Sequence, residues 1–256
     1  KLPFGSKSKK EDPVPNESAR PSSLLDYELP PIALLSEVSE RRKPLKSEGA
    51  TTAQLLEETL TEFGVDAEVV DVQQGPVVTR YEVLPARGVR VEKISGLSNN
   101  IALALKATSV RVQAPVPGKG VVGIEIPNLR SQMVFVREIL EGEEWTASEA
   151  ALPLVLGKDV GGQDLVIDLA LAPHLLIAGA TGSGKTVCMN SILAGLLMSR
   201  TPAQMNLMLI DPKIVEFSNY NGLPHLVTPV VTDAKKVAIA LRWAIQEMEK
   251  RYKLFA

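Results

Sequence analysis

The sequence predicts an α/β protein in which a small α+β domain precedes a second unit built on a parallel sheet. Two features carry this prediction. A glycine-rich loop at residues 179–186 lies between an apolar run and a helical segment, in the strand, loop, helix order of phosphate-binding domains. Upstream, between residues 51 and 126, helical periodicity and strand-like alternation follow each other twice. The segment before both parts is rich in Pro, Ser and charges, and we expect it to be a disordered linker.

Length and composition limit the class of protein. With 256 residues, of which 45% are hydrophobic, the chain is long enough for two ordinary domains with cores of their own. The 28 basic and 30 acidic residues give a formal charge of −2, so any DNA contact must come from local basic loops and not from the overall charge. A single cysteine, Cys188, excludes internal disulfides and zinc clusters of repeated Cys-x-x-Cys type.

No stretch of the sequence is apolar for long enough to span a membrane. The longest apolar runs, such as residues 192–198, fall short of the about 20 residues that a spanning helix needs. Residue 1 begins no signal peptide, so we expect this segment to be soluble and to make no membrane contact itself. Because the sequence does not begin with Met, we expect it to be a piece of a longer protein, and an upstream membrane segment stays open.

We expect three parts along the chain: a linker at residues 1–50, an α+β domain at 51–150 and a phosphate-loop domain at 151–256. The linker is predicted to end in an extended docking segment at residues 29–32. Its basic cluster could contact phosphate, but we interpret it as solvated; the residues are Lys7, Lys9 and Lys10.

The first half of the α+β domain is predicted to be a helix followed by a hairpin. Leu56, Leu60 and Phe63 recur at helical spacing along one face of a helix that begins near Thr51 and ends at Gly64. Period-2 alternation then predicts a hairpin, with a turn at residues 74–76; its strands lie near residues 67–69 and at 77–84.

The second half of this domain repeats the pattern. A second helix is predicted from the spacing of Ile94, Leu97, Ile101 and Leu105. Another strand pair follows across the Pro- and Gly-rich connection 115–120; its strands are 110–113 and 121–126. We expect the compact module to end near residues 127–128.

The second domain is predicted to start near Leu152 and to hold the strands of a parallel sheet. Residues 165–168 are interpreted as an edge strand, 174–178 as a buried strand and 207–210 as its neighbour, because βαβ units connect parallel strands. A helix at residues 187–199 leaves the glycine-rich loop. Asp233 is predicted to cap a last helix with one apolar face, formed by Val237, Leu241, Ala244, Met248 and Tyr252.

Residues 179–186 read Gly-Ala-Thr-Gly-Ser-Gly-Lys-Thr, a complete G-x-x-x-x-G-K-[ST] phosphate loop, and predict binding of ATP with Mg²⁺. Glycines allow the backbone N–H groups to turn inward at the phosphates, helped by the helix dipole. Lys185 is predicted to reach the β- and γ-phosphates, and the Thr186 hydroxyl to bind Mg²⁺, so both are the candidate catalytic residues. The candidate nucleotide-binding residues are Gly179, Ala180, Thr181, Gly182, Ser183, Gly184, Lys185, Thr186 and Val187.

Three further polar residues were candidates for chemistry. Asp211 follows an apolar run and could be the Mg²⁺-orienting carboxylate of such a site, but Pro212 and Lys213 follow it in place of an acidic neighbour, so we interpret it as a loop-positioning residue. His174 and His225 each lie between a proline and a leucine, and we interpret both as packing or local hydrogen-bonding residues.

Several blocks together resemble the FtsK/SpoIIIE family of DNA translocases. The motor segment of that family is similar to Pro-His-Leu-Leu-Ile-Ala-Gly-Ala-Thr-Gly-Ser-Gly-Lys-Thr at residues 173–186, and the resemblance continues through residues 209–213, 220–226, 229–233 and 247–252. Residues 75–82 and 112–119 resemble the α domain that precedes this motor. The resemblance covers nearly everything after about residue 25.

This resemblance implies a RecA-like P-loop NTPase domain that assembles into a hexameric ring around double-stranded DNA. It implies an ATP-driven translocase for chromosome partitioning at cell division, working on the cytoplasmic side of the bacterial cell membrane at the septum. In the family, a strand with an Asp-Glu pair lies beyond the helix that contains Glu-Met-Glu-x-Arg-Tyr. This chain ends at that helix, so we expect an incomplete sheet and no hydrolysis by the chain alone.

Other functions stay open on the sequence alone. One alternative is an ATPase of protein secretion or of conjugative DNA transfer, since related ATPases serve these processes. A GTPase or small-molecule kinase is a second alternative, although no Asn-Lys-x-Asp guanine signature follows the loop. A third is that the α+β domain acts chiefly as an oligomerisation collar.

Overall fold

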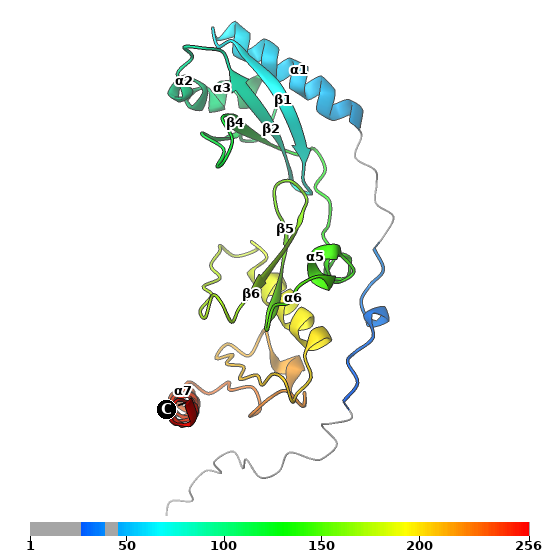
Figure 1. Ribbon diagram of the computed structural model, residues 1–256, viewed down its shortest axis with the longest axis vertical. Helices are drawn as coiled ribbons and strands as arrows, with labels where there is room; N and C mark the ends of the chain where they lie inside the picture. The colour runs from blue at the N-terminus through cyan, green and yellow to red at the C-terminus, as the bar shows by residue number, and fades with distance from the viewer. Residues whose placement is uncertain (1–26, 39–45, 256) are drawn as a thin grey trace, which may run out of the picture. The chain divides into compact units, whose positions relative to one another are not determined.

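The computed structural model describes residues 27–38 and 46–255 and divides into two compact units (Figure 1). One unit is Pro31–Leu196; the other comprises Leu197–Ala256 together with the segment up to Pro30. Most of the predicted linker, including Lys7, Lys9 and Lys10, lies outside the described residues. The predicted docking segment is extended at Pro31 but enters a 3₁₀ turn at Ile32–Leu34.

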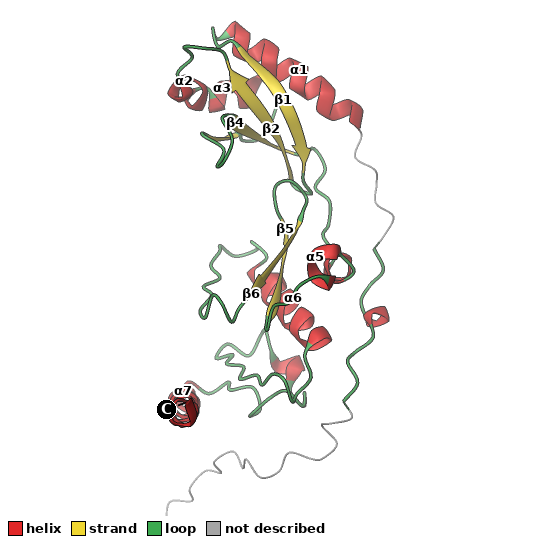
Figure 2. Ribbon diagram, viewed as in Figure 1, coloured by secondary structure: helices red, strands yellow, loops and turns green. Residues whose placement is uncertain are grey.

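The first unit contains a four-stranded antiparallel sheet with the strand order β1-β2-β4-β3. Figure 2 shows β1, β2 and β4 of this sheet. Both predicted strand pairs are confirmed, and β2 and β4 join them in the middle of the sheet. A register shift between Val69 and Asp71 interrupts the pairing of β1 with β2. The strands are β1 Ala67–Gln74, β2 Val78–Pro85, β3 Arg111–Gln113 and β4 Val122–Pro127.

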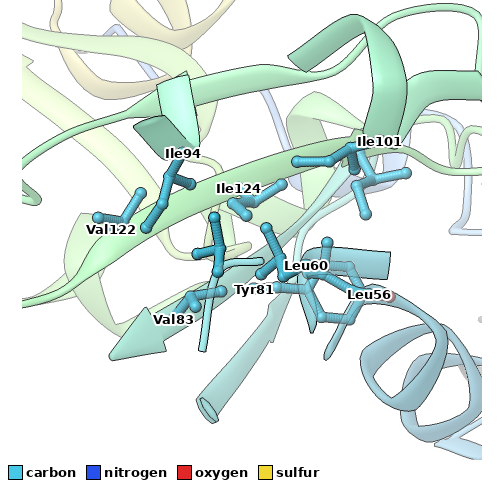
Figure 3. Packing of buried hydrophobic residues seen from close by; sticks show 10 residues of the cluster. Leu56, Leu60, Tyr81, Val83, Ile94, Ile101, Val122 and Ile124 are labelled. Atoms are coloured by element: carbon cyan, nitrogen blue, oxygen red, sulfur yellow. The ribbon is translucent and has the colours of Figure 1, made fainter. Parts of the chain in front are cut away.

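One face of this sheet packs against helices and forms the core (Figure 3). Helix α1 spans Lys46–Glu62, and it buries Leu56 and Leu60 completely. Phe63, which was predicted on the same face of this helix, follows the end of α1 and is 40% exposed. The other buried residues of this core are Val65, Tyr81, Val83, Ile94, Ile101, Val122, Ile124 and Ile126.

The single helix predicted around residues 94–105 is two helices. Helix α2 covers Val91–Gly96 and α3 covers Ser98–Ala104, with a break at Leu97, where ψ is 4°. The residues that flank the break are Gly, Ser and Asn, which are poor helix formers. Ile94 and Ile101 are nevertheless both buried, so the apolar spacing identified the core positions although it missed the break.

Helix α1 ends as predicted at Gly64, in a Schellman motif. Gly64 has a φ of 67°, a left-handed conformation that a glycine adopts without the cost of a β-carbon. Its N–H donates to the Thr61 carbonyl, and the Val65 N–H donates to the Leu60 carbonyl, both at 2.9 Å. Leu60 and Val65 are fully buried, which is the apolar contact that accompanies this motif. The motif fixes the direction in which the chain enters β1.

The opposite face of the sheet carries a row of charges. Glu125 of β4 lies opposite Arg80 of β2 and Arg111 of β3, and its carboxylate binds Arg80 at 2.7 Å and Arg111 at 3.3 Å. Glu125 is only 5% exposed. Beside this row, Lys119 of the loop between β3 and β4 reaches both oxygens of buried Glu82 at 2.6 and 2.7 Å. Each buried carboxylate therefore has a cationic partner.

A hairpin and three helices complete the first unit up to Leu196. Strand β5, Pro153–Lys158, pairs with β6, Asp164–Asp168, so the predicted edge strand has an antiparallel partner that the sequence interpretation missed. Helices α4 Val136–Leu140 and α5 Glu143–Thr146 precede the hairpin, and α6 Lys185–Ser199 follows it. Burial disfavours the charged form of Lys158, but its hydrogen bonds to Asp164 and Glu138 outweigh that effect and raise its pKa.

The second unit contains two extended segments that run parallel. Isolated bridges join Leu207 to Leu226 and Ile210 to Val231, so the predicted strand at 207–210 exists as single bridges and not as a continuous strand. A 3₁₀ turn at Ser218–Tyr220 lies between the two segments. The last element is helix α7, Ala234–Phe255.

Helix α7 begins where predicted, and the Asp233 side chain accepts the Lys235 N–H at 2.9 Å. The predicted pair of Glu247 with Arg251 is also present, at 2.7 Å. No residue of α7 is buried, and Met248 on the predicted apolar face is 60% exposed. Within the described residues, no helix is both long and apolar enough to cross a membrane.

Candidate nucleotide-binding site

The predicted phosphate loop is an exposed turn that leads directly into α6. Gly182 and Gly184 have φ values of 81° and 90°, which only glycine adopts readily. The Ser183 N–H donates to the Ala180 carbonyl at 3.1 Å and closes the turn. All residues from 179 to 185 are exposed, so the backbone of the loop is accessible to a ligand.

Helix α6 places the two candidate catalytic residues in its first turn. Lys185 is the first residue of the helix and is exposed, whereas Thr186 is half-buried. The Cys188 N–H bonds to the Gly184 carbonyl at 2.8 Å, and the Asn190 side chain donates to the Thr186 carbonyl at 3.0 Å. The positive end of the helix dipole therefore lies at the loop, where Lys185 begins the helix.

The far half of α6 anchors the site to the first unit. Ile192, Leu193 and Leu196 are buried, and Gly195 lies against Val155 of β5. Val187, the last of the nine predicted nucleotide-binding residues, is 68% exposed on the first turn. The helix is thus fixed at its C-terminal half, and the loop end is open.

The residues of the loop fit a triphosphate with Mg²⁺. Two left-handed glycines, a helix N-terminus and one lysine provide N–H donors and positive charge for phosphate oxygens. The Thr186 hydroxyl is a hard oxygen ligand of the kind that Mg²⁺ prefers. In residues 27–38 and 46–255, no group of three or more His, Cys, Asp or Glu side chains is placed to hold a metal ion.

The buried strand predicted at residues 174–178 is not present. These residues form no strand, Leu176 is 90% exposed, and the His174 N–H bonds locally to the Ala172 carbonyl at 2.6 Å. A strand of a parallel sheet forms only where neighbouring strands accept and donate its backbone hydrogen bonds. In the described part of the chain, no strand is paired with residues 174–178. Apolar composition alone therefore did not produce the strand.

Asp211 organises the loop that follows it. Its side chain is 3% exposed and accepts four backbone N–H bonds between 2.9 and 3.1 Å. The donors are Ile214, Val215, Glu216 and Phe217. Ile214 has a φ of 57°, an unusual conformation for a β-branched residue, and the four bonds hold it there. The geometry supports the interpretation of Asp211 as a loop-positioning residue.

The hydrogen bonds to Asp211 predict a pH dependence. Those from Glu216 and Phe217 lower its pKa most, since they stabilise the carboxylate against burial. The contribution of these bonds to the stability of the folded loop is complete above the pKa of an unfolded Asp, about 3.9. It is lost as the pH falls through the lower pKa of Asp211 in the folded state. We expect Asp211→Asn to disorder the loop at neutral pH and to abolish this acid transition.

Amide NMR signals of residues 214–217, followed from pH 7 to pH 2, measure this effect. Asp233→Asn is the control, because asparagine also provides an oxygen for the cap of α7. An Asp211→Asn variant with unchanged loop signals at neutral pH would contradict the assigned role.

The two histidines differ in their surroundings. His225 is fully buried, and its Nε2 lies 2.8 Å from the Arg200 carbonyl oxygen, while the Tyr27 ring meets it edge-on at 5.5 Å. These contacts agree with the interpretation of His225 as a packing and hydrogen-bonding residue. His174 is exposed and does not pack in a core, and its backbone N–H makes the local hydrogen bond to the Ala172 carbonyl. Cys188, the single cysteine, is half-buried in α6.

One organising residue near the site was not identified from the sequence. Asp168, at the end of β6, accepts backbone N–H bonds from Ala151, Leu152 and Ala170 at 2.9 to 3.0 Å. It therefore ties together the two ends of the hairpin, immediately before the segment that leads to the phosphate loop. An aspartate that ends an apolar run is a recognisable turn signal, and this signal could have indicated its role.

Comparisons with known proteins match both parts of the chain. The FtsK/SpoIIIE family model matches residues 135–256, and the FtsK alpha domain model matches residues 29–128. The DNA translocase FtsK of Clostridium acetobutylicum is 52% identical over 248 residues, which cover 96% of this chain and 32% of that protein. The DNA translocase FtsK of Staphylococcus aureus strain Mu50 is 46% identical over 239 residues, covering 93% of this chain and 30% of that protein.

A solved structure shows a more distant likeness. The pCW3 conjugation coupling protein TcpA, in its monomer form with ATPγS, is 19% identical, with a TM-score of 0.39. The match covers 80% of this chain and 56% of that chain. The chain spans about a third of the length of the curated relatives that it matches.

Proposed function

This chain belongs to the FtsK/SpoIIIE family, and on that premise we propose that it forms part of an ATP-driven translocase of double-stranded DNA. The motor would move chromosomal DNA during partitioning at cell division. The observation that carries the proposal is the complete phosphate loop at the start of α6, in a chain whose two parts match two models of one family.

The proposed chemistry of the complete protein is the reaction of ATP with water to give ADP and phosphate. The N–H groups of Gly182 and its neighbours hold the phosphates, and Lys185 neutralises the negative charge on the β- and γ-phosphates. The Thr186 hydroxyl is a ligand for Mg²⁺, which when bound supplies further positive charge to the phosphates. Phosphoryl transfer depends mostly on positioning and electrostatics, so a preformed loop with a fixed helix suits it.

The proposed partners are double-stranded DNA and further copies of the same chain in a hexameric ring. The proposed location is the cytoplasmic side of the cell membrane at the septum. Family membership supports these assignments, and the formal charge of −2 requires that the DNA contacts come from local basic surfaces. The predicted domain at 51–150 would then be the α domain of the translocase, and the predicted domain at 151–256 would be part of its motor domain.

The alternative is an ATPase of protein secretion or of conjugative DNA transfer. Relatives of 46% to 52% identity are named DNA translocase FtsK, which favours chromosomal DNA as the cargo. The match of residues 29–128 to the FtsK alpha domain adds to this preference.

The rate of ATP hydrolysis by the complete protein tests the proposal. We expect linear duplex DNA to stimulate hydrolysis strongly, because a translocase couples turnover to its track. A peptide taken from a secretion substrate should have no effect, and GTP should bind more weakly than ATP. Stimulation by the peptide and not by duplex DNA would favour the alternative, and equal affinity for GTP and ATP would argue for a different class of phosphate-loop protein.

A further inference from the structure

The hairpin β5–β6 contacts two other parts of its unit, each at a glycine. One contact is with α6, the helix that begins at the phosphate loop, and the other is with the turn between β1 and β2 (Figure 1). We propose that this hairpin relays the nucleotide state of the loop to the four-stranded sheet, with Gly195 and Gly75 as positioning residues. The inference rests on the proposed function, because it requires that the loop binds nucleotide.

The first contact joins the hairpin to α6. A β-carbon on Gly195 would lie 2.9 Å from a methyl group of Val155 and 3.3 Å from the Trp145 ring. Val155 is 2% exposed, so it cannot turn out into solvent. Gly195 follows Lys185 on the same helix by about 15 Å of helical rise. A shift of α6 at its loop end therefore presses directly on β5.

The second contact joins the tip of the hairpin to the sheet. A β-carbon on Gly75 would lie 2.5 Å from the Val160 carbonyl oxygen, closer than any real β-carbon approaches. A β-carbon on Gly162, on the other side of the contact, would lie 3.3 Å from the Gln74 carbonyl oxygen. The two turns thus meet backbone to backbone. Such a contact cannot be relaxed by the rotation of a side chain, so displacement of one turn displaces the other.

Hydrogen bonds make both turns stiff. In the β1–β2 turn, the Asn128 side chain donates to the Gly75 carbonyl at 2.8 Å and accepts from the Thr79 hydroxyl at 2.7 Å. In the hairpin tip, the Asp159 side chain accepts the N–H groups of Gly161 and Gln163 at 2.8 and 2.9 Å. Neither turn can absorb a displacement without breaking these bonds.

Strand pairing and ion pairs hold the hairpin together between the two contacts. Its strands are paired from Pro153 with Asp168 to Lys158 with Asp164, with a register shift between Val155 and Gly157. Lys158 binds Glu138 of α4 at 3.1 Å and also binds Asp164. The open end is tied by Asp168, as described above. Coupling between distant sites needs a contiguous physical network of this kind, and its existence must be tested by measurement.

Hydrogen exchange in the complete protein, with and without ATPγS, tests the relay. In the unaltered protein we expect ATPγS to slow exchange in the loop, residues 179–186, and also in the β1–β2 turn, residues 74–78. In Gly75→Ala, the loop should remain protected, and the nucleotide effect on the turn should fall by about fivefold or more. Gly96→Ala is the matched control, since a β-carbon at Gly96 meets no atom within 4 Å and should leave both effects unchanged.

The outcomes separate the relay from the proposed function. Protection of the loop without any change in the turn of the unaltered protein would overturn the relay and leave nucleotide binding intact. No protection of the loop would overturn the proposed nucleotide site and the relay together. Thermal unfolding checks that each variant folds; if Gly75→Ala does not, Gly195→Ala makes the same comparison at the other contact. A turn in either folded variant that responds as in the unaltered protein also contradicts the relay.

Discussion

Replacement of Lys185 by alanine is expected to abolish ATP turnover by the complete protein, with a loss of at least about a hundredfold. The physical reason is that Lys185 is the one cationic side chain within residues 179–186, and it lies at the helix end where phosphate charge would be neutralised. Without it, the loop retains its N–H donors but has no full positive charge. Steady-state ATP hydrolysis with duplex DNA present, together with ATPγS binding, measures the effect.

Lys253→Ala is the matched control for this prediction. Lys253 is also an exposed lysine on a helix, but it lies in the last turn of α7 and outside the predicted site. We expect that variant to hydrolyse ATP as the unaltered protein does. Full DNA-stimulated hydrolysis by Lys185→Ala would show that the nucleotide site has been assigned to the wrong residues.

Replacement of Glu125 by glutamine is expected to lower the free energy of unfolding of the first unit by about 3 kcal/mol. The change removes the negative charge between Arg80 and Arg111 but keeps the shape of the side chain. The side chain of Arg80 is only 15% exposed, so its guanidinium would be left largely buried without a counter-charge. Its Nε atom is already buried and has no hydrogen-bond partner in the described part of the chain. Urea unfolding followed by circular dichroism measures the loss.

A solvent-exposed pair provides the comparison. Glu247 binds Arg251 at 2.7 Å on α7, where the arginine side chain is 62% exposed. Pairs of this kind contribute about 0.3–0.5 kcal/mol, so Glu247→Gln should change stability little. Equal losses in the two variants would mean that burial does not set the strength of the Glu125 pairs. The double replacement Arg80→Met with Glu125→Leu should recover much of the stability that Glu125→Gln loses.

Local sequence patterns predicted the four-stranded sheet well, because the alternation of apolar and charged residues in each strand determines which side chains face the core. Val83 and Tyr81 alternate with Glu82 along β2, and that alternation puts apolar side chains on the helix side and charges on the other. Gly64 likewise ends α1 by its own backbone preference. At these positions, residues that are close together in the sequence determine the local structure.

The parallel strands were predicted less well because their partners are distant. Leu176 and Ile210 belong to runs with similar apolar composition, yet residue 210 has a bridge to Val231, whereas residues 174–178 form no strand. The composition of an apolar run does not indicate which segment pairs with it. In parallel pairing, the partner segment is always distant in the sequence. Met248 and its neighbours on α7 present the same problem, since periodicity identifies an apolar face but not what covers it.

The loop motif and the family resemblance made different contributions to the candidate site. The spacing of glycines with Lys185 and Thr186 was sufficient to predict a triphosphate site at a helix start, and the structure has a left-handed Gly182 and Gly184 there. No local pattern could indicate DNA as the cargo, since the overall charge is slightly negative. That assignment came from blocks spread over the whole chain. The packing of Gly195 and Gly75 could not be predicted, because a glycine in a sequence does not reveal what approaches it.

The Asp211 loop has a consequence for how this chain meets anions from solution. Four successive backbone N–H groups converge on one carboxylate, the arrangement by which proteins capture free phosphate or sulfate. Here the anion is tethered to the same backbone, three to six residues away, so its binding to these N–H groups is intramolecular. The loop therefore carries its own anion, and while Asp211 is ionised these N–H groups need no anion from solution.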